Sequence, residues 1–155
     1  MIGGILKKIF FKNGQNSSDN FETLATEQKI RIAITAIMIE AVNADGNLTK
    51  KELSGIINQI KNRFDLNTEE SEHLIKLAQK YRNENPDIWY FTNIINEHLH
   101  KDAKYEIIEM VWTVIYSDGN LDKYENSISH KLRGLLHIEH SKFIEIKLKV
   151  IKDIK

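Results

Sequence analysis

Apolar residues recur along most of the chain at the spacing of one face of an α-helix. From residue 21 onward they fall three and four positions apart, and no stretch alternates between apolar and polar residues as a half-buried strand does. The set Ile30, Ile34, Ile37, Met38 and Ala41 illustrates the pattern and predicts one buried helix face. The pattern as a whole predicts an all-α fold.

Capping residues and the single proline divide this pattern into seven predicted helices. Thr26, Thr68 and Ser141 are residue types that cap helix N-termini, and Pro86 ends the third segment. The predicted helices cover about residues 26–44, 50–64, 68–85, 87–100, 102–117, 123–136 and 141 to the end. We expect them to pack into one bundle.

Aromatic residues fall at helical spacing within these segments. Trp89, Tyr90, Phe91 and Trp112 are predicted to lie in the core. The sequence leaves open that Tyr90 or Tyr116 is exposed in a groove and marks a site for a protein partner.

The first twenty residues differ from the rest of the chain. Their apolar positions form one helical stripe with lysines on or near the other side: Ile2, Ile5, Leu6, Ile9, Phe10 and Lys7, Lys8, Lys12. A polar, turn-forming stretch, 13–20, follows. A tethered basic amphipathic helix of this kind binds an anionic membrane surface, and docking on the domain or on a partner is the alternative. We therefore predict a segment, 1–20, that can contact a membrane surface through residues 1–12, and an all-helical domain, 21–155.

Charge is balanced overall but unevenly distributed. Residues 1–19 carry three lysines against one aspartate, and residues 142–155 carry five lysines against two acidic residues, which leaves the body between them acidic. No concentrated basic surface of a nucleic-acid binder is evident. The chain has no cysteine, no apolar run of about 18 residues and no secretory leader, so we expect a cytoplasmic protein, with the inner membrane face as the surface within its reach.

A short motif occurs twice. Residues 45–52 read D-G-N-L-T-K-K-E and residues 118–125 read D-G-N-L-D-K-Y-E, identical at six of eight positions. Gly46 stands where a helix ends in the left-handed conformation, and Thr49 with Glu52 forms the pattern of a capping box; the second copy carries a close variant. The motif predicts two pseudo-repeated units, each a helix, a D-G turn and a second helix.

The spacing of the motif also matches the second half of an EF-hand calcium loop. With Gly46 at loop position 6, position 1 is Ala41, and its counterpart in the second copy is Val114. A calcium loop needs oxygen ligands at its start. Neither copy is therefore predicted to be an EF-hand.

The paired turns resemble the TerB-like family of tellurite resistance proteins. Two A/S-D-G-x-L-x-x-x-E turns between helices, with W-T-V-I-Y leading into the second, carry this resemblance over roughly residues 25–150. It implies a small all-helical bundle without established enzymatic activity. It also implies an association with tellurite and general chemical stress, and with metal-linked complexes near the membrane.

The resemblance further implies a weakly bound divalent cation, Ca²⁺, Mg²⁺ or Mn²⁺, at the acidic turn residues. Carried over position by position, the candidate ligands are Asp45 and Glu52 in the first turn and Asp118 and Glu125 in the second. Glu40, one turn earlier in the first helix, could add another oxygen. Its counterpart in the second copy is Thr113, so the two sites are not equivalent.

Two other residue patterns have the spacing of metal ligands. Glu70-x-x-His73 and Glu97-x-x-His100 have the i, i+3 spacing of di-iron helical bundles, which also need two further inward glutamates. His98-x-His100 and His137-x-x-His140 straddle predicted helix ends, where solvated or capping histidines are commoner than zinc ligands. No phosphate-binding loop and no nucleophile with an evident base is present.

The sequence thus predicts a non-catalytic, TerB-like domain that acts through protein partners, with a cation at its acidic turns and a membrane-surface contact. The alternatives are an interaction module without any ion and a di-iron oxidoreductase.

Overall fold

The structure is a computed structural model that describes residues 21–42, 48–117 and 127–154. Over these residues the chain is helical and contains no strand, which confirms the predicted all-α class. The elements are η1 (Phe21–Thr23), α2 (Thr26–Val42), α3 (Lys50–Phe64), α4 (Thr68–Glu84), α5 (Trp89–His98), α6 (Lys101–Ile115), α7 (Ser127–Leu135) and α8 (His140–Ile154). The predicted N-terminal segment lies outside the described residues.

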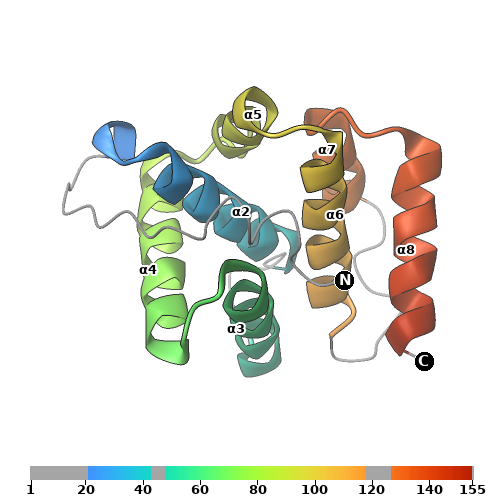
Figure 1. Ribbon diagram of the computed structural model, residues 1–155, viewed down its shortest axis with the longest axis horizontal. Coiled ribbons are helices and arrows are strands. Elements are labelled where there is room, and N and C mark those ends of the chain that lie inside the picture. Colours follow the sequence, from blue (N-terminus) through green and yellow to red (C-terminus); the bar gives the residue numbers. More distant parts are fainter. Residues whose placement is uncertain (1–20, 43–47, 118–126, 155) are drawn as a thin grey trace.

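Helix α2 is the centre of the bundle. It runs diagonally between α4 and α6, with α5 above it and α3 below it in Figure 1, and it packs against all four. From Ile30 onward its sequence is apolar on almost every side, which is typical of a helical segment without a solvent-facing surface. The five residues predicted to face inward are all buried. The buried hydroxyl of Thr35 donates a hydrogen bond to the Arg31 carbonyl at 2.8 Å, so this polar group is satisfied within the helix.

The three predicted caps are each displaced by one or two residues. Helix α4 is capped by Asn67, not Thr68: Asn67 Oδ1 accepts from the Glu70 N–H at 2.7 Å, and Glu70 Oε1 accepts from the Asn67 N–H at 2.9 Å. A capping box needs a glutamate three residues after its cap, and only Asn67 has one. At α8 the Phe143 N–H donates to the Glu139 carbonyl, so Ser141 lies inside the first turn instead of capping it.

Thr26 is likewise the first residue of α2 and not its cap, since the Lys29 N–H donates to the carbonyl of Ala25.

The second helices of the two predicted repeats end alike. Asp65 and His137 both adopt the left-handed conformation with φ of 59°, a common way to end a helix. The repeat as a whole remains a prediction, because residues 43–47 and 118–126 are outside the described part of the chain.

The aromatic prediction is correct for two residues and wrong for one. Phe91 and Trp112 are buried and Tyr90 is half-buried, but Trp89 is 52% exposed. Residues two apart on a helix point in nearly opposite directions, so Trp89 and Phe91 cannot both face the core. Tyr116 is fully buried and stacks on Trp112 with ring centroids 5.5 Å apart, so it cannot mark an exposed partner groove.

Candidate functional site

The first acidic turn leads into α3 through a complete capping box. Thr49 Oγ1 accepts from the Glu52 N–H at 3.1 Å, and Glu52 Oε1 accepts from the Thr49 N–H at 3.0 Å. The Glu52 side chain is buried at the N-terminal end of the helix, where the helix dipole favours a negative charge. This confirms the capping role predicted from the sequence.

The structure brings α3 against the residue that precedes the second acidic turn. A Cβ atom added to Gly55 would lie 3.0 Å from Ser117 Oγ and 3.3 Å from Ser117 Cβ, so the helix passes the end of α6 at very short range. Gly55 is three residues after Glu52 and shares its side of the helix. Ser117 is followed directly by Asp118. Glu52, the last residue of the first motif, and Ser117, the residue before the second motif, therefore lie in neighbouring parts of the molecule.

This close approach predicts opposite outcomes for two glycine-to-alanine substitutions. Alanine is favoured over glycine inside a helix by about 1 kcal/mol. Gly134→Ala in α7 should gain much of that, because nothing lies within 4 Å of the added Cβ. Gly55→Ala should lose the gain or destabilise the fold, because Ser117 must move. Urea denaturation of both variants measures the difference, and equal stabilisation by both would show that α3 and Ser117 are not in contact.

Glu40, the candidate oxygen ligand in α2, is paired with an arginine of α4. Its Oε1 accepts from Arg82 Nη2 at 2.7 Å. Arg82 Nη1 also donates to the carbonyls of Asn85 and Pro86, so the side chain ties α2 to the end of α4. In the second copy Thr113 instead donates to the Glu109 carbonyl at 2.7 Å. A cation at Glu40 would therefore compete with Arg82.

The remaining candidate ligands, Asp45, Asp118 and Glu125, lie outside the described residues. Among the residues that the structure does describe, no three histidine, aspartate or glutamate side chains gather as a metal site requires. The two E-x-x-H pairs have all four side chains exposed, and Glu70 caps α4, whereas a di-iron bundle needs such pairs to face inward.

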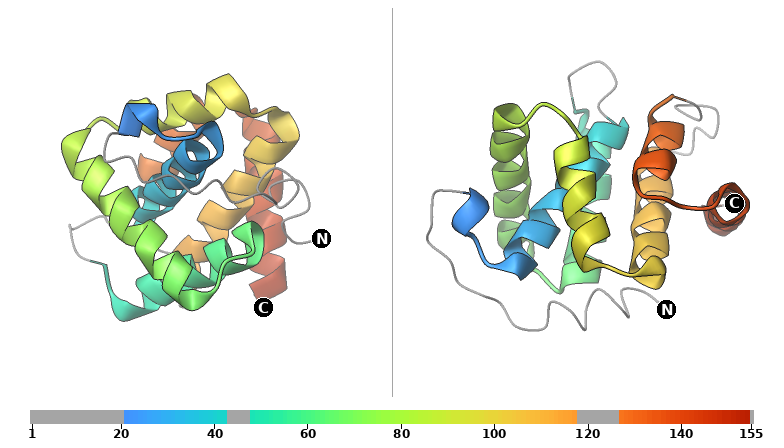
Figure 2. Two further views of the ribbon diagram at one scale, coloured as in Figure 1. Left: turned by 60° about the vertical axis from the view of Figure 1, so that its left-hand side comes forward. Right: turned by 90° about the horizontal axis from the view of Figure 1, so that it is seen from above.

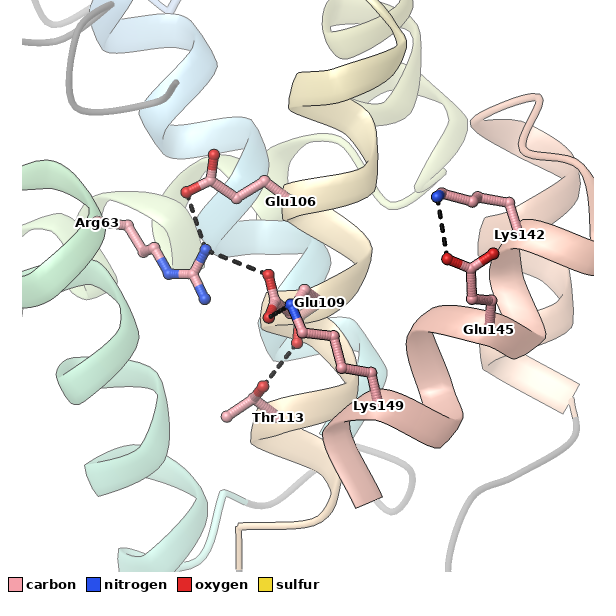
Figure 3. Close-up of polar contacts among 7 residues, drawn as sticks. All are labelled: Arg63, Glu106, Glu109, Thr113, Lys142, Glu145 and Lys149. Carbon is pink, nitrogen blue, oxygen red and sulfur yellow. Dashed lines mark hydrogen bonds and ion pairs between the residues drawn. The ribbon is translucent and has the colours of Figure 1, made fainter. Parts of the chain in front are cut away.

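Sequence reasoning missed a cluster of charged side chains that joins three helices (Figure 3). Arg63 of α3 places Nη1 2.8 Å from Glu106 Oε2 and 3.7 Å from Glu109 Oε1, both on α6. Lys149 of α8 lies 3.4 Å from the other oxygen of Glu109. The side chains of Arg63 and Glu106 are only 6% and 10% exposed. The two acidic residues stand at i, i+3 next to the apolar residues in the second half of α6. That spacing was the signal in the sequence for a shared partner.

Over the described residues no helix has the length and apolar character needed to cross a membrane.

Comparison with known families gives one informative match: residues 31–148 fit the family described as tellurite resistance protein TerB. Neither the curated proteins nor the solved structures contain a match. The matched region runs from the second turn of α2 to the middle of α8 and includes both D-G turns and the α3–α6 contact. This chain therefore belongs to the TerB family of tellurite resistance proteins.

Proposed function

We propose that this tellurite-resistance-associated domain is non-catalytic and acts by binding other proteins, with a divalent cation held weakly at its acidic turns. The observation that carries the proposal is the family match, which spans both turns and nearly all of the helical bundle. Family membership predicts the fold directly, and the interaction role follows from it as an expectation.

The geometry around α3 supports one shared cation patch in preference to two separate sites. Gly55 of α3, the helix that follows the first motif, lies against Ser117, the residue directly before Asp118. Carboxylate oxygens are the ligands preferred by Ca²⁺, Mg²⁺ and Mn²⁺. In this proposal Glu52 and Glu125 cap their helices, and Asp45 and Asp118 supply most of the negative charge that balances the cation.

A titration of the full chain tests the cation. Amide NMR shifts should move saturably with Ca²⁺, Mg²⁺ or Mn²⁺ (read as line broadening for Mn²⁺) at residues that flank the turns, such as Leu48, Glu52 and Ser117. Joint replacement of Asp45→Asn and Asp118→Asn should abolish this response, because it removes both turn carboxylates.

The matched control removes two charges elsewhere, by Asp65→Asn and Asp102→Asn. Asparagine tolerates the left-handed conformation of residue 65, so this control should fold normally and respond as the natural sequence does. If the shifts are flat, or if both double variants respond alike, the turns hold no specific cation.

The alternative is an interaction module without any ion, and the capping box favours it. Glu52 already satisfies the Thr49 N–H and sits at a helix N-terminus, so its presence in the motif has a sufficient structural reason. Under this alternative the double aspartate variant also recovers the same protein partners as the natural sequence in affinity capture.

We also propose a cytoplasmic location with contact to the inner membrane face through residues 1–12. The basic amphipathic pattern of that segment supports it.

A further inference from the structure

Helix α8 has an apolar side that the described part of the chain does not cover. Phe143, Ile146 and Val150 point into the bundle and are buried, chiefly against α6. Figure 2 shows α8 at the outer edge of the molecule, so its opposite side faces outward. Leu148 lies on that side and is 58% exposed, the largest exposed fraction of any large apolar residue in the described chain.

Two half-buried residues extend this exposed leucine into a stripe. Ile144 and Ile151 stand four residues before and three residues after Leu148, so the three share one side of the helix. Both isoleucines also pack against the core, so only their outer parts extend the stripe. Ile154, 39% exposed, adds apolar surface at the C-terminal end. A helix with apolar residues on both its inner and outer sides has more apolar surface than packing on α6 requires.

Lysines border the stripe on both sides. At 100° per residue, Lys147 falls on one side of the Ile144–Leu148–Ile151 stripe and Lys152 on the other. Within α8 four lysines stand against Glu145 and Asp153. Lys149 pairs with Glu109 and Lys142 with Glu145, whereas Lys152 forms no ion pair with any described residue. The Nζ atom of Lys147 lies 5.5 Å from the centroid of the Trp112 ring, so that side of the border is already engaged. Lys152 is the border lysine that is open to an anionic partner.

We propose that the outward side of α8 lies on an anionic lipid surface, with Leu148 and its neighbouring isoleucines inserted and the lysines at the headgroups. An apolar stripe bordered by lysines is the arrangement of an interfacial helix. The helix stands at the edge of the bundle (Figure 1), where a lipid surface can reach its outward side. Stable anchoring to a membrane surface takes two weak contacts, and we expect residues 1–12 to supply the second one. Only this second contact rests on the proposed function.

The absence of cysteine allows a direct test on the full chain. Ser141, exposed on the outward side of α8, is replaced by Ser141→Cys and labelled with an environment-sensitive fluorophore; Lys76→Cys on α4 is the control position. Vesicles of phosphatidylcholine with phosphatidylglycerol should shift the emission to the blue at position 141 and not at position 76. Pure phosphatidylcholine should shift neither.

Substitutions then identify the groups that bind. Leu148→Gln should weaken vesicle binding roughly tenfold, because it removes an inserted side chain. Lys152→Glu should weaken it by about tenfold or more, because it reverses a charge at the headgroups. Trp89→Gln and Lys76→Glu make the same chemical changes on other faces and should leave binding unchanged. All four positions are exposed, so the variants should keep the fold.

A variant of the N-terminal segment separates the two membrane contacts. If Ile9→Asp abolishes flotation while the label at position 141 never responds, the α8 proposal is wrong and the contact through residues 1–12 stands. If the label responds and Ile9→Asp has no effect, α8 binds lipid and the role of residues 1–12 is wrong. A chain that does not bind anionic vesicles at all overturns both.

Discussion

Replacing Arg63 by methionine should reduce the free energy of unfolding by about 3–5 kcal/mol. The Arg63 guanidinium lies 2.8 Å from the Glu106 carboxylate and 3.7 Å from that of Glu109, and neither Arg63 nor Glu106 is more than 10% exposed. Without the guanidinium, two carboxylates three residues apart on α6 are left side by side at a poorly solvated interface. The stability is lost because a buried charge is left without a partner. This loss is larger than the net stabilisation that the intact ion pair provides.

A charge-matched comparison isolates this effect. Lys149 also lies close to Glu109, at 3.4 Å, but its side chain is 63% exposed. Lys149→Met should therefore cost no more than about 1 kcal/mol, as solvent-exposed ion pairs usually do. Combining Arg63→Met with Glu106→Leu removes both members of the buried pair and should recover most of the lost stability.

Urea denaturation followed by circular dichroism measures all three variants. Equal small losses for Arg63→Met and Lys149→Met would mean that the Arg63 cluster is solvated in solution. A double variant no more stable than Arg63→Met alone would show that the loss does not come from the uncompensated charge of Glu106.

The elements that could be predicted from the sequence are those set by local spacing. The predicted span 50–64 and the Thr49–Glu52 box agree with α3, because capping and helical periodicity involve residues only a few positions apart. The cap of α4 was misplaced by one residue because threonine and asparagine are both good caps, and only the position of Glu70 decides between them.

Features that depend on contacts between distant segments could not be predicted in this way. Arg63 and Glu106 are 43 positions apart, and nothing in the local pattern connects them. The contact between Gly55 and Ser117 likewise exists only once α3 has packed against α6. Of the candidate cation ligands, Glu52 was correctly predicted to cap its helix, and the pairing of Glu40 with Arg82 emerged only from the structure.

Phe21→Ala should destabilise the domain by about 3–4 kcal/mol, although Phe21 is the first residue of the described structure. Its ring is 4% exposed and packs on three aromatic rings of α4 and α5, with centroids 5.0 Å from Tyr81, 5.6 Å from Tyr90 and 6.0 Å from Phe91. Removing it would leave a cavity between η1 and the bundle. The loss would be large for a residue beside a terminal segment, because chain ends usually contribute little.

The contacts next to Phe21 reinforce this anchor. The hydroxyl of Tyr90 donates a hydrogen bond to the Glu22 carboxylate. Burial and the neighbouring Glu22 charge raise the pKa of Tyr90 to about 12, so the hydroxyl keeps its proton at neutral pH and remains a donor. Lys29 in turn lies 3.7 Å from Glu22. Phe21→Ala should therefore also release η1, visible as faster amide exchange at Leu24.

Trp89→Ala is the control, because it removes a larger aromatic side chain from the same region. Trp89 is 52% exposed, so its loss should cost no more than about 1 kcal/mol. The sequence predicted that Trp89 lies in the core. If thermal and urea unfolding show the two variants to be equally stable, Phe21 is not an anchor and the domain begins later than residue 21. A larger loss for Phe21→Ala would show that the cooperative unit includes this residue.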